Sequence, residues 1–420
     1  MKFYYENKNA GYYRVYDMKT CKFTIEYTLP HAFHTFKDYE NSDKGLLKYI
    51  ADFKVWNNDL KTNNIFKLDY EQFKKHDTAV DIVFTKKLVD EDFTKFEEPD
   101  MIEFGWIEKC NNGSIQKLYC KPNTKIQSYG YDFKSTYGYF LGNKTCRALQ
   151  MPTKRGKEYI LTELDCSKLQ VGYYHVEISS KDVNFNKIFL YSKDNVYCDI
   201  SLYQAFQCSK TMKVNIELIQ DDKPNAYLYG KGIKDGIISP HKVFGKWYEV
   251  LTKLKNAFPE NKLIKHLLSS GWGSFCRFQK LNLTIDEIKE KDLNVSLNIY
   301  KKDCDYVILE HKCKYNGDYY VLVDPNKPYH YGQIARLKPF LLSLARRCTA
   351  NIALLHIDNV IRIHTDNVST DKQFDDVMTA FKTYPELIVE TKTTGMITWQ
   401  SVNSYKNHDT GEIHGMYKET

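Results

Sequence analysis

The chain has 420 residues, 42% of them hydrophobic and 15% aromatic, which is enough for two or three subdomains with packed cores. Its 60 Lys and Arg outnumber 53 Asp and Glu, and the net charge of +7 fits a nucleic-acid groove but fits a solvated surface equally well. Eleven cysteines, an odd number with no Cys-x-x-Cys pair, argue against a disulfide framework and against a zinc ribbon.

The N-terminal residues lack the apolar core of a signal peptide, and the longest apolar runs, such as 351–357, are too short to span a bilayer. We therefore expect a soluble, intracellular protein without a membrane partner. The abundance of Lys, Asn, Tyr and Ile is typical of an AT-rich genome, as in many viruses and linear plasmids. The host cytoplasm or an organelle would then be its location.

The first predicted elements lie in residues 1–105. Alternating aromatics at 12–16 and 23–27 predict strands, and residues 70–84 have helical spacing.

A clearer strand follows at residues 129–133, and it carries Asp132 near its end, directly before a helix that opens at Ser135. Further strands are predicted at 171–178, 187–191 and 212–218, separated by polar turns.

Residues 244–258 predict an amphipathic helix that ends at Pro259, and a second helix begins at Lys262. This second helix carries Lys265 and runs into the glycine-rich stretch 269–273. The pattern indicates a helical hairpin.

The next predicted element is a β-hairpin, because residues 307–314 and 319–323 flank Asn316-Gly317, the strongest short hairpin signal in the chain. Residues 332–355 then have helical spacing, with a kink expected at Pro339.

Near the C-terminus, apolar residues at 361 and 363 alternate with Arg362 and His364, the period of a half-buried strand. Asp366-Asn367 forms a turn pair before a second short strand. By itself this is an ordinary hairpin with a solvated Asp in its turn.

Together and in this order, the stretches around Asp132, Lys265 and Asp366 resemble motifs A, B and C of family B DNA polymerases, most of all the protein-primed and viral-organellar branch. The resemblance implies an α+β right-hand polymerase fold with an antiparallel palm sheet and helical-hairpin fingers. Residues 1–105 would be a reduced exonuclease-like region. Residues 106–420 would be palm and fingers with a vestigial thumb, an insertion at about 155–240 and a hairpin insertion at about 300–325.

The resemblance implies a two-metal site. Asp132 and Asp366 would be the catalytic carboxylates and metal ligands, with the Phe133 carbonyl as a further ligand. The cofactor would be two Mg²⁺ ions, with Mn²⁺ as a substitute.

The resemblance also assigns nucleotide and DNA contacts. Tyr137 would lie under the sugar and exclude a 2′-hydroxyl, and Lys265 would bind the triphosphate, with Lys253 or Lys255 as a helper. The nucleotide-binding set is Ser135, Thr136, Tyr137, Lys253, Lys265 and Trp272. The DNA-binding set is Ser269, Ser270, Gly271, Gly273, Thr365, Tyr405 and Lys406.

Several positions depart from the family pattern. Gly138 stands where the family usually has Pro, His364 replaces the first Asp of motif C, and Asn403 replaces the Lys of the Lys-x-Tyr motif completed by Tyr405. Asn111-Asn112-Gly113-Ser114 stands where relatives carry a template-contacting glycine-rich loop, and it reads equally as a plain turn.

A loose match to the third exonuclease motif covers Phe73 to Asp77, but no Asp-x-Glu precedes it. One carboxylate cannot position two metal ions and a water, so we expect a scaffold remnant without proofreading.

The sequence thus predicts a template-directed DNA polymerase that replicates a viral or linear-plasmid genome. Its partners would be template-primer DNA, dNTPs and a terminal priming protein or processivity partner. One alternative is an inactive polymerase-fold protein that serves as a DNA-binding or scaffolding subunit. Another is a metal-dependent nuclease, which a triphosphate Lys and a sugar gate fit less well.

Overall fold

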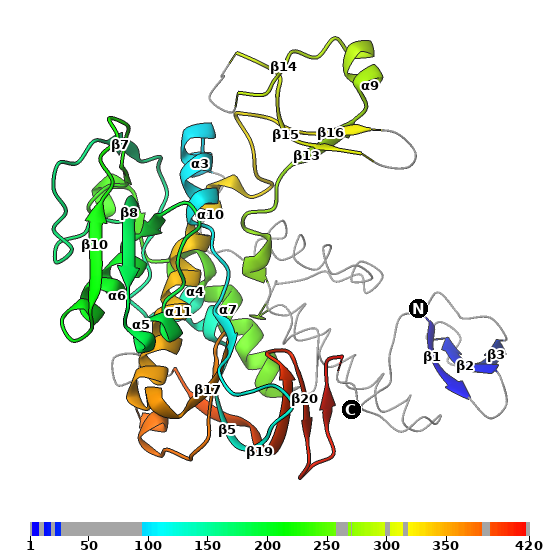
Figure 1. Cartoon of the computed structure of the whole chain (residues 1–420). Coiled ribbons are helices and arrows are strands. Elements are labelled where there is room, and N and C mark those ends of the chain that lie inside the picture. The colour runs from blue at the N-terminus through cyan, green and yellow to red at the C-terminus, as the bar shows by residue number, and fades with distance from the viewer. Residues whose placement is uncertain are drawn as a thin grey trace. The chain divides into compact units, whose positions relative to one another are not determined.

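A computed structural model describes residues 2–7, 12–17, 22–26, 95–257, 268–269, 271–298, 303–313, 318–379 and 387–416 (Figure 1). The chain divides into two compact units, Met1–Asp90 with Lys246–Leu268 and Glu91–Gly245 with Ser269–Thr420. Both motif carboxylates belong to the second unit. Among the described helices, none combines the length and apolar character that a membrane crossing requires.

The first unit begins with a three-stranded antiparallel sheet of β1 (Lys2–Asn7), β2 (Tyr12–Asp17) and β3 (Lys22–Glu26). Strands β2 and β3 occupy the two stretches where alternating aromatics predicted strands. The predicted helix at 70–84, with the exonuclease-like Asp77, lies outside the described residues.

Helix α7 (His241–Ala257) matches the predicted amphipathic helix and runs from the second unit into the first. The predicted second helix of the hairpin lies outside the described residues, because 258–267 are not described. The helical-hairpin fingers therefore stay a prediction.

A seven-stranded sheet dominates the second unit, and the antiparallel palm sheet expected from the sequence matches it. Its order is β21 (Ile413–His414), β20 (Ser404–Asn407), β19 (Val389–Ser401), β5 (Lys125–Phe133), β18 (Asn367–Thr370), β17 (Val360–His364) and β4 (Gln116–Leu118). Every pair in it is antiparallel. Strand β5 is central, and a Cβ at Gly130 would meet the Lys392 carbonyl, so only glycine permits this close approach of β5 and β19.

Helix α11 (Leu337–Leu355) is largely buried and contacts α4 (Thr136–Gly142), α5 (Val183–Ile188), α6 (Asp199–Ser209) and β18. The sequence predicted one helix over 332–355 with a kink at Pro339. The structure instead has a short α10 (Gly332–Ala335) and a break at Arg336. Pro339 causes no kink because it lies in the first turn of α11, where a missing N–H breaks no helical bond.

The middle of the chain forms a second sheet packed with α5 and α6. Its strands are β7 (Lys157–Tyr159), β8 (Gly172–Ser180), β9 (Val196–Cys198), β10 (Val214–Leu218) and β11 (Ala226–Leu228). The predicted strands at 171–178 and 212–218 match β8 and β10. The strand predicted at 187–191 was wrong, because Asp182 caps α5 through the Asn184 and Phe185 amides and α5 continues to Ile188.

The predicted hairpin is present as β15 (Tyr306–Lys312) and β16 (Tyr319–Val323), in a four-stranded sheet with β13 (Lys280–Leu283) and β14 (Val295–Ser296). A capping box between Thr284 and Glu287 begins α9 (Ile285–Glu290) beside it. The remaining elements are α3 (Met101–Cys110), β6 (Met151–Pro152), β12 (Ile237–Ile238) and 3₁₀ turns at Ile233–Asp235, Gly271–Ser274, Ile357–Asn359 and Asp376–Thr379.

A fully buried ion pair joins α3 to the break between α10 and α11. Arg336 donates from Nε and Nη2 to the two carboxylate oxygens of Glu103, at 2.6 and 2.9 Å, and from Nη1 to the Glu97 carbonyl. The Tyr229 hydroxyl completes the group by donating to Glu103 at 2.8 Å. Such a pair costs desolvation energy, so its value lies in fixing the geometry rather than in raising the net stability.

We expect Arg336→Met to destabilise the second unit by about 3–5 kcal/mol, because the Glu103 carboxylate would remain buried without its partner. The double variant Glu103→Gln/Arg336→Met should lose much less than the sum of the single losses. Urea unfolding of the four members of this cycle measures the coupling. The exposed pair of Lys168 and Asp165 provides the control, since Lys168→Ala should leave the midpoint almost unchanged.

Candidate active site

The sheet register brings the two motif carboxylates to one end of neighbouring strands. Asn367, the first residue of β18, pairs with Asp132 near the end of β5, and Asp366 directly precedes Asn367 in the turn after β17. The Phe133 amide also donates to the Asp366 carbonyl at 3.3 Å, which joins the two motifs through the backbone. Residues 234 positions apart in sequence thus lie at neighbouring strand ends.

The turn that follows Asp132 and the turn that carries Asp366 each contain a residue with left-handed backbone geometry. Ser135, after β5, has φ +56°, and Thr365, directly before Asp366, has φ +59°. Neither residue is glycine, so each conformation costs free energy and persists only because the surroundings enforce it.

Three hydrogen bonds, from the 114–115 loop and from α11, hold the Thr365 turn in place. The Thr365 amide donates to the Ile115 carbonyl at 2.9 Å, and the Thr365 carbonyl accepts from the Thr349 hydroxyl of α11 at 3.1 Å. The hydroxyls of Ser114 and Thr365 share a hydrogen bond of 3.2 Å.

Arg346 of α11 anchors the loop that supplies Ser114. Its Nη1 donates to the carbonyls of Asn112 and Gly113 at 2.9 and 2.6 Å, and its Nη2 donates to the Ser343 hydroxyl at 2.7 Å. The Asn-Asn-Gly-Ser stretch, for which a plain turn was an equal reading, therefore helps to position the turn that carries Asp366.

Asp366 lies in an environment that disfavours its charge. Burial, followed by the negative charge of Asp132, raises the pKa of Asp366 to about 6. The Thr136 hydroxyl opposes this rise by donating to Asp366 Oδ2 at 2.9 Å. Because Thr136 is buried and its hydroxyl is engaged here, any contact it makes with a triphosphate would come from its backbone N–H.

Lys392 is the site residue that sequence reasoning missed. Glu390 pairs with Asp132 across β19 and β5, and the Lys392 ammonium forms ion pairs with Asp132 and, at 2.6 Å, with Glu390. Burial opposes the charge, but these hydrogen bonds outweigh it and raise the pKa of Lys392. The sequence signal was the Glu-Thr-Lys alternation at residues 390–392, but only the register shows which carboxylate Lys392 faces.

Tyr137 and Trp272 bring the helix after Asp132 and the glycine-rich stretch 269–273 together. Their ring centroids are 4.5 Å apart with the planes tilted by 34°. Tyr137 is only 6% exposed, and burial together with the charge of Asp366 raises its pKa, so its phenol is neutral. The Trp272 indole donates to the Ser269 carbonyl at 2.6 Å, which fixes the indole over the Gly271–Ser274 turn.

Other assigned residues lie elsewhere. Lys265 and Ser270 are outside the described residues, as is the Lys253 side chain. Lys406 pairs with Thr398, which pairs with Lys125 at the opposite end of β5 from Asp132. Lys125 and Asp132 are seven residues apart on β5, roughly 24 Å at about 3.4 Å per residue, so Lys406 lies far from the carboxylates.

Tyr405 lies in that distant part of the sheet, where its ring is 4.9 Å from Trp399 and 5.2 Å from His414. Near the carboxylates, Lys392 forms an ion pair with Asp132.

Strand β17 is buried on both faces rather than half-buried as predicted. Arg362 lies under the surface, donates to the Val402 carbonyl and to Asn367 Oδ1, both at 2.8 Å, and stacks over Trp399. Burial lowers the pKa of Arg362 to about 10, so it stays charged at neutral pH. Burial, then the charge of Arg362, lowers the pKa of His364 to about 4, so His364 is neutral at neutral pH.

Comparison with solved structures shows which known fold this chain resembles. No family model matches the chain, and no curated protein matches it in sequence. Among solved structures, Phi29 DNA polymerase in a ternary complex with primer-template DNA and incoming nucleotide aligns with a TM-score of 0.51 and 13% identity, over 92% of this chain. The same polymerase with single-stranded DNA aligns with a TM-score of 0.51 and 15% identity.

This chain therefore has a polymerase-like fold, and it spans 65% of the length of the Phi29 enzyme. The likeness at this identity concerns the fold alone.

The raised pKa of Asp366 predicts a pH-dependent stability penalty. The folded state binds the Asp366 proton up to about pH 6 and the unfolded chain only to about 3.8, so stability falls as pH rises through this window. Asp366→Asn should remove this loss of folding free energy, which is at most about 2–3 kcal/mol. In chelator-treated protein, Asp366→Asn should therefore raise the melting temperature relative to the wild type only slightly at pH 4. The increase should grow with pH and reach its largest value above pH 6.

The exposed Asp375, nine positions further along the chain, provides the matched control. An equal gain from Asp375→Asn, or a gain from Asp366→Asn that does not change with pH, would contradict the prediction.

Proposed function

We propose that the chain is a template-directed DNA polymerase that adds deoxynucleotides to a primer 3′-hydroxyl. The observation that carries the proposal is the β5–β18 register, which places Asp132 and Asp366 at adjacent strand ends. The fold similarity to Phi29 DNA polymerase supports it. We extend the proposal to family B, to its protein-primed branch and to replication of a viral or linear-plasmid genome.

The donor set at this site fits a hard divalent cation. Asp132, Asp366 and the Phe133 carbonyl offer only oxygen ligands, which Mg²⁺ prefers, and Mn²⁺ accepts the same set. The Phe133 carbonyl oxygen lies 3.3 Å from the hydroxyl oxygen of Thr136, which also contacts Asp366 Oδ2, so this carbonyl lies close to Asp366. When bound, two such ions would lower the pKa of the primer hydroxyl and neutralise charge on the leaving pyrophosphate.

The protein side chains have distinct tasks in this proposal. Lys392 balances the charge of Asp132 while no cation is present, and it must give way or share the carboxylate when one binds. Thr136 holds Asp366 in a fixed rotamer, so that the carboxylate is oriented before the substrate arrives.

Tyr137 and Trp272 form the surface for the incoming nucleotide. Tyr137 is buried and its ring packs against Trp272, so we expect the ring to stay in place and to close the space that a 2′-hydroxyl would need. Template-primer DNA, dNTPs and a priming or processivity protein are the partners that this proposal implies.

Primer extension with Mg²⁺ tests the proposal directly. Asp132→Ala and Asp366→Ala, made separately, should each lower the extension rate by at least about 100-fold, because each removes charge stabilisation available only at this site. Asp375→Ala is the control for a lost surface carboxylate, and circular dichroism confirms folding. If both variants extend primers at a near wild-type rate, the polymerase proposal is wrong, and the alternative of a polymerase-fold scaffolding subunit takes its place.

Tyr137 should control sugar selection without being required for catalysis. Tyr137→Ala should keep deoxynucleotide addition and admit ribonucleotides, because the ring that occupies the 2′ position is lost. Tyr137→Phe keeps the ring and drops only the hydroxyl, so it should retain discrimination. The ratio of kcat/KM values for dATP and ATP measures the effect, and loss of discrimination in Tyr137→Phe would show that the hydroxyl, not the ring, is responsible.

A further inference from the structure

The β15–β16 hairpin brings together three side chains with metal-ligand chemistry. Its last pairs are His311 with Tyr320 and Lys312 with Tyr319, and the same register continued one step sets Cys313 opposite Asp318. Side chains alternate between the faces of a strand, so His311 and Cys313 share one face. On the other face, Lys312 forms an ion pair with Glu310 at 3.1 Å.

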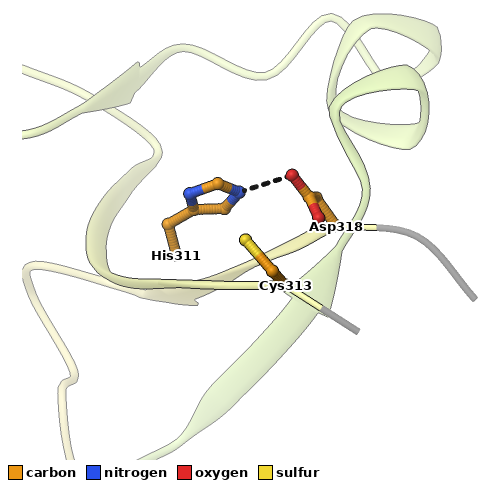
Figure 2. Close-up of side chains that lie close together, drawn as sticks. All are labelled: His311, Cys313 and Asp318. Atoms are coloured by element: carbon orange, nitrogen blue, oxygen red, sulfur yellow. Dashed lines mark hydrogen bonds and ion pairs between the residues drawn. The ribbon is translucent and has the colours of Figure 1, made fainter. Parts of the chain in front are cut away.

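The three side chains point toward one another in Figure 2. One ligand atom from each of His311, Cys313 and Asp318 lies within 4.8 Å of the other two. His311 Nε2 lies 3.2 Å from Asp318 Oδ2. Within the described residues, this is the one group of three or more His, Cys, Asp or Glu side chains that meets this criterion.

We propose that His311, Cys313 and Asp318 bind one Zn²⁺ ion, with water as the fourth ligand. A thiolate and an imidazole are soft and borderline donors that select Zn²⁺ over Mg²⁺ or Ca²⁺, and three protein ligands plus water complete its tetrahedral coordination. On binding, the Cys313 thiol gives its proton to solvent and the His311–Asp318 contact is exchanged for bonds to the metal. No electron transfer is involved.

Two features of the hairpin favour a site over a chance contact. The His311 ring stacks on Tyr320, with centroids 4.7 Å apart and planes within 15°, so its orientation is held without the ion. The three residues are exposed, which leaves space for a water ligand and a path of entry for the ion. The bound ion would tie β15 to β16 just beyond their last ladder pair.

The proposal does not depend on the polymerase assignment. The motif carboxylates offer oxygen ligands only, whereas the hairpin offers sulfur and nitrogen, so the two sites bind different classes of metal. The cysteine count alone argued against a zinc ribbon, and that argument does not extend to a site with a single thiolate.

Cobalt titration of the full-length, chelator-treated chain in excess Mg²⁺ tests the site. We expect one equivalent of Co²⁺ to bind with a near-ultraviolet thiolate-to-cobalt charge-transfer band, and Zn²⁺ to displace it. Cys313→Ser should abolish the band. Asp318→Asn should weaken Co²⁺ binding by at least about tenfold, since even residues outside the ligand set cost about 10–100-fold when removed.

Glu310→Gln is the matched control, because it removes a carboxylate from the opposite face of the same strand and should leave binding unchanged. Absence of a thiolate band in the wild type, or its persistence in Cys313→Ser, would overturn the proposal.

A second readout leaves all three proposed ligands in place. Zn²⁺ should slow iodoacetamide labelling of Cys313, measured by mass spectrometry of its peptide, in the wild type and in Glu310→Gln. Equal labelling with and without Zn²⁺ would likewise overturn the proposal.

Discussion

The site depends on the register of β5 between β18 and β19. That register sets Asn367 and Glu390 on either side of Asp132, and so brings Asp366 and Lys392 to the same strand end. Slipping either neighbour by one residue would turn its side chains to the other face of the sheet and disperse the cluster. Gly130 protects the register, because any side chain there would push β19 away.

The cluster is held together at a cost in free energy. Two carboxylates face each other, and Ser135 and Thr365 adopt backbone geometry that non-glycine residues avoid. Lys392 offsets the charge of Asp132, and Thr136 offsets part of the cost at Asp366. The Thr365 turn is further restrained from α11, directly by Thr349 and through the Ser114 loop by Arg346, so the helix beneath the sheet also sets the geometry of the site.

Local pattern predicted much of this arrangement but not all of it. Alternation and turn signals located β5, the β17–β18 turn and the β15–β16 hairpin, because those signals lie within a few residues. Lys392 and Arg346 could not be found this way, since each depends on a register or contact between distant segments. The ligand group of His311 lies within one predicted hairpin, but the pairing of Cys313 with Asp318 depends on the exact register of its strands. The strand expected at 187–191 failed because Asp182 caps a helix that apolar alternation alone does not reveal.

The free-energy cost of the buried Asp366 carboxylate is relevant to the choice between an active enzyme and a scaffold. Fold similarity to Phi29 DNA polymerase at 13% identity does not distinguish them, because one fold can serve several functions. A scaffold gains nothing from an ionisable carboxyl whose pKa is raised to about 6, and a single change of Asp366 to Asn would relieve the penalty while keeping the Thr136 hydrogen bond. Under the proposed function, a bound divalent cation would turn the repulsion that remains between the two carboxylates, beyond what Lys392 offsets, into binding energy.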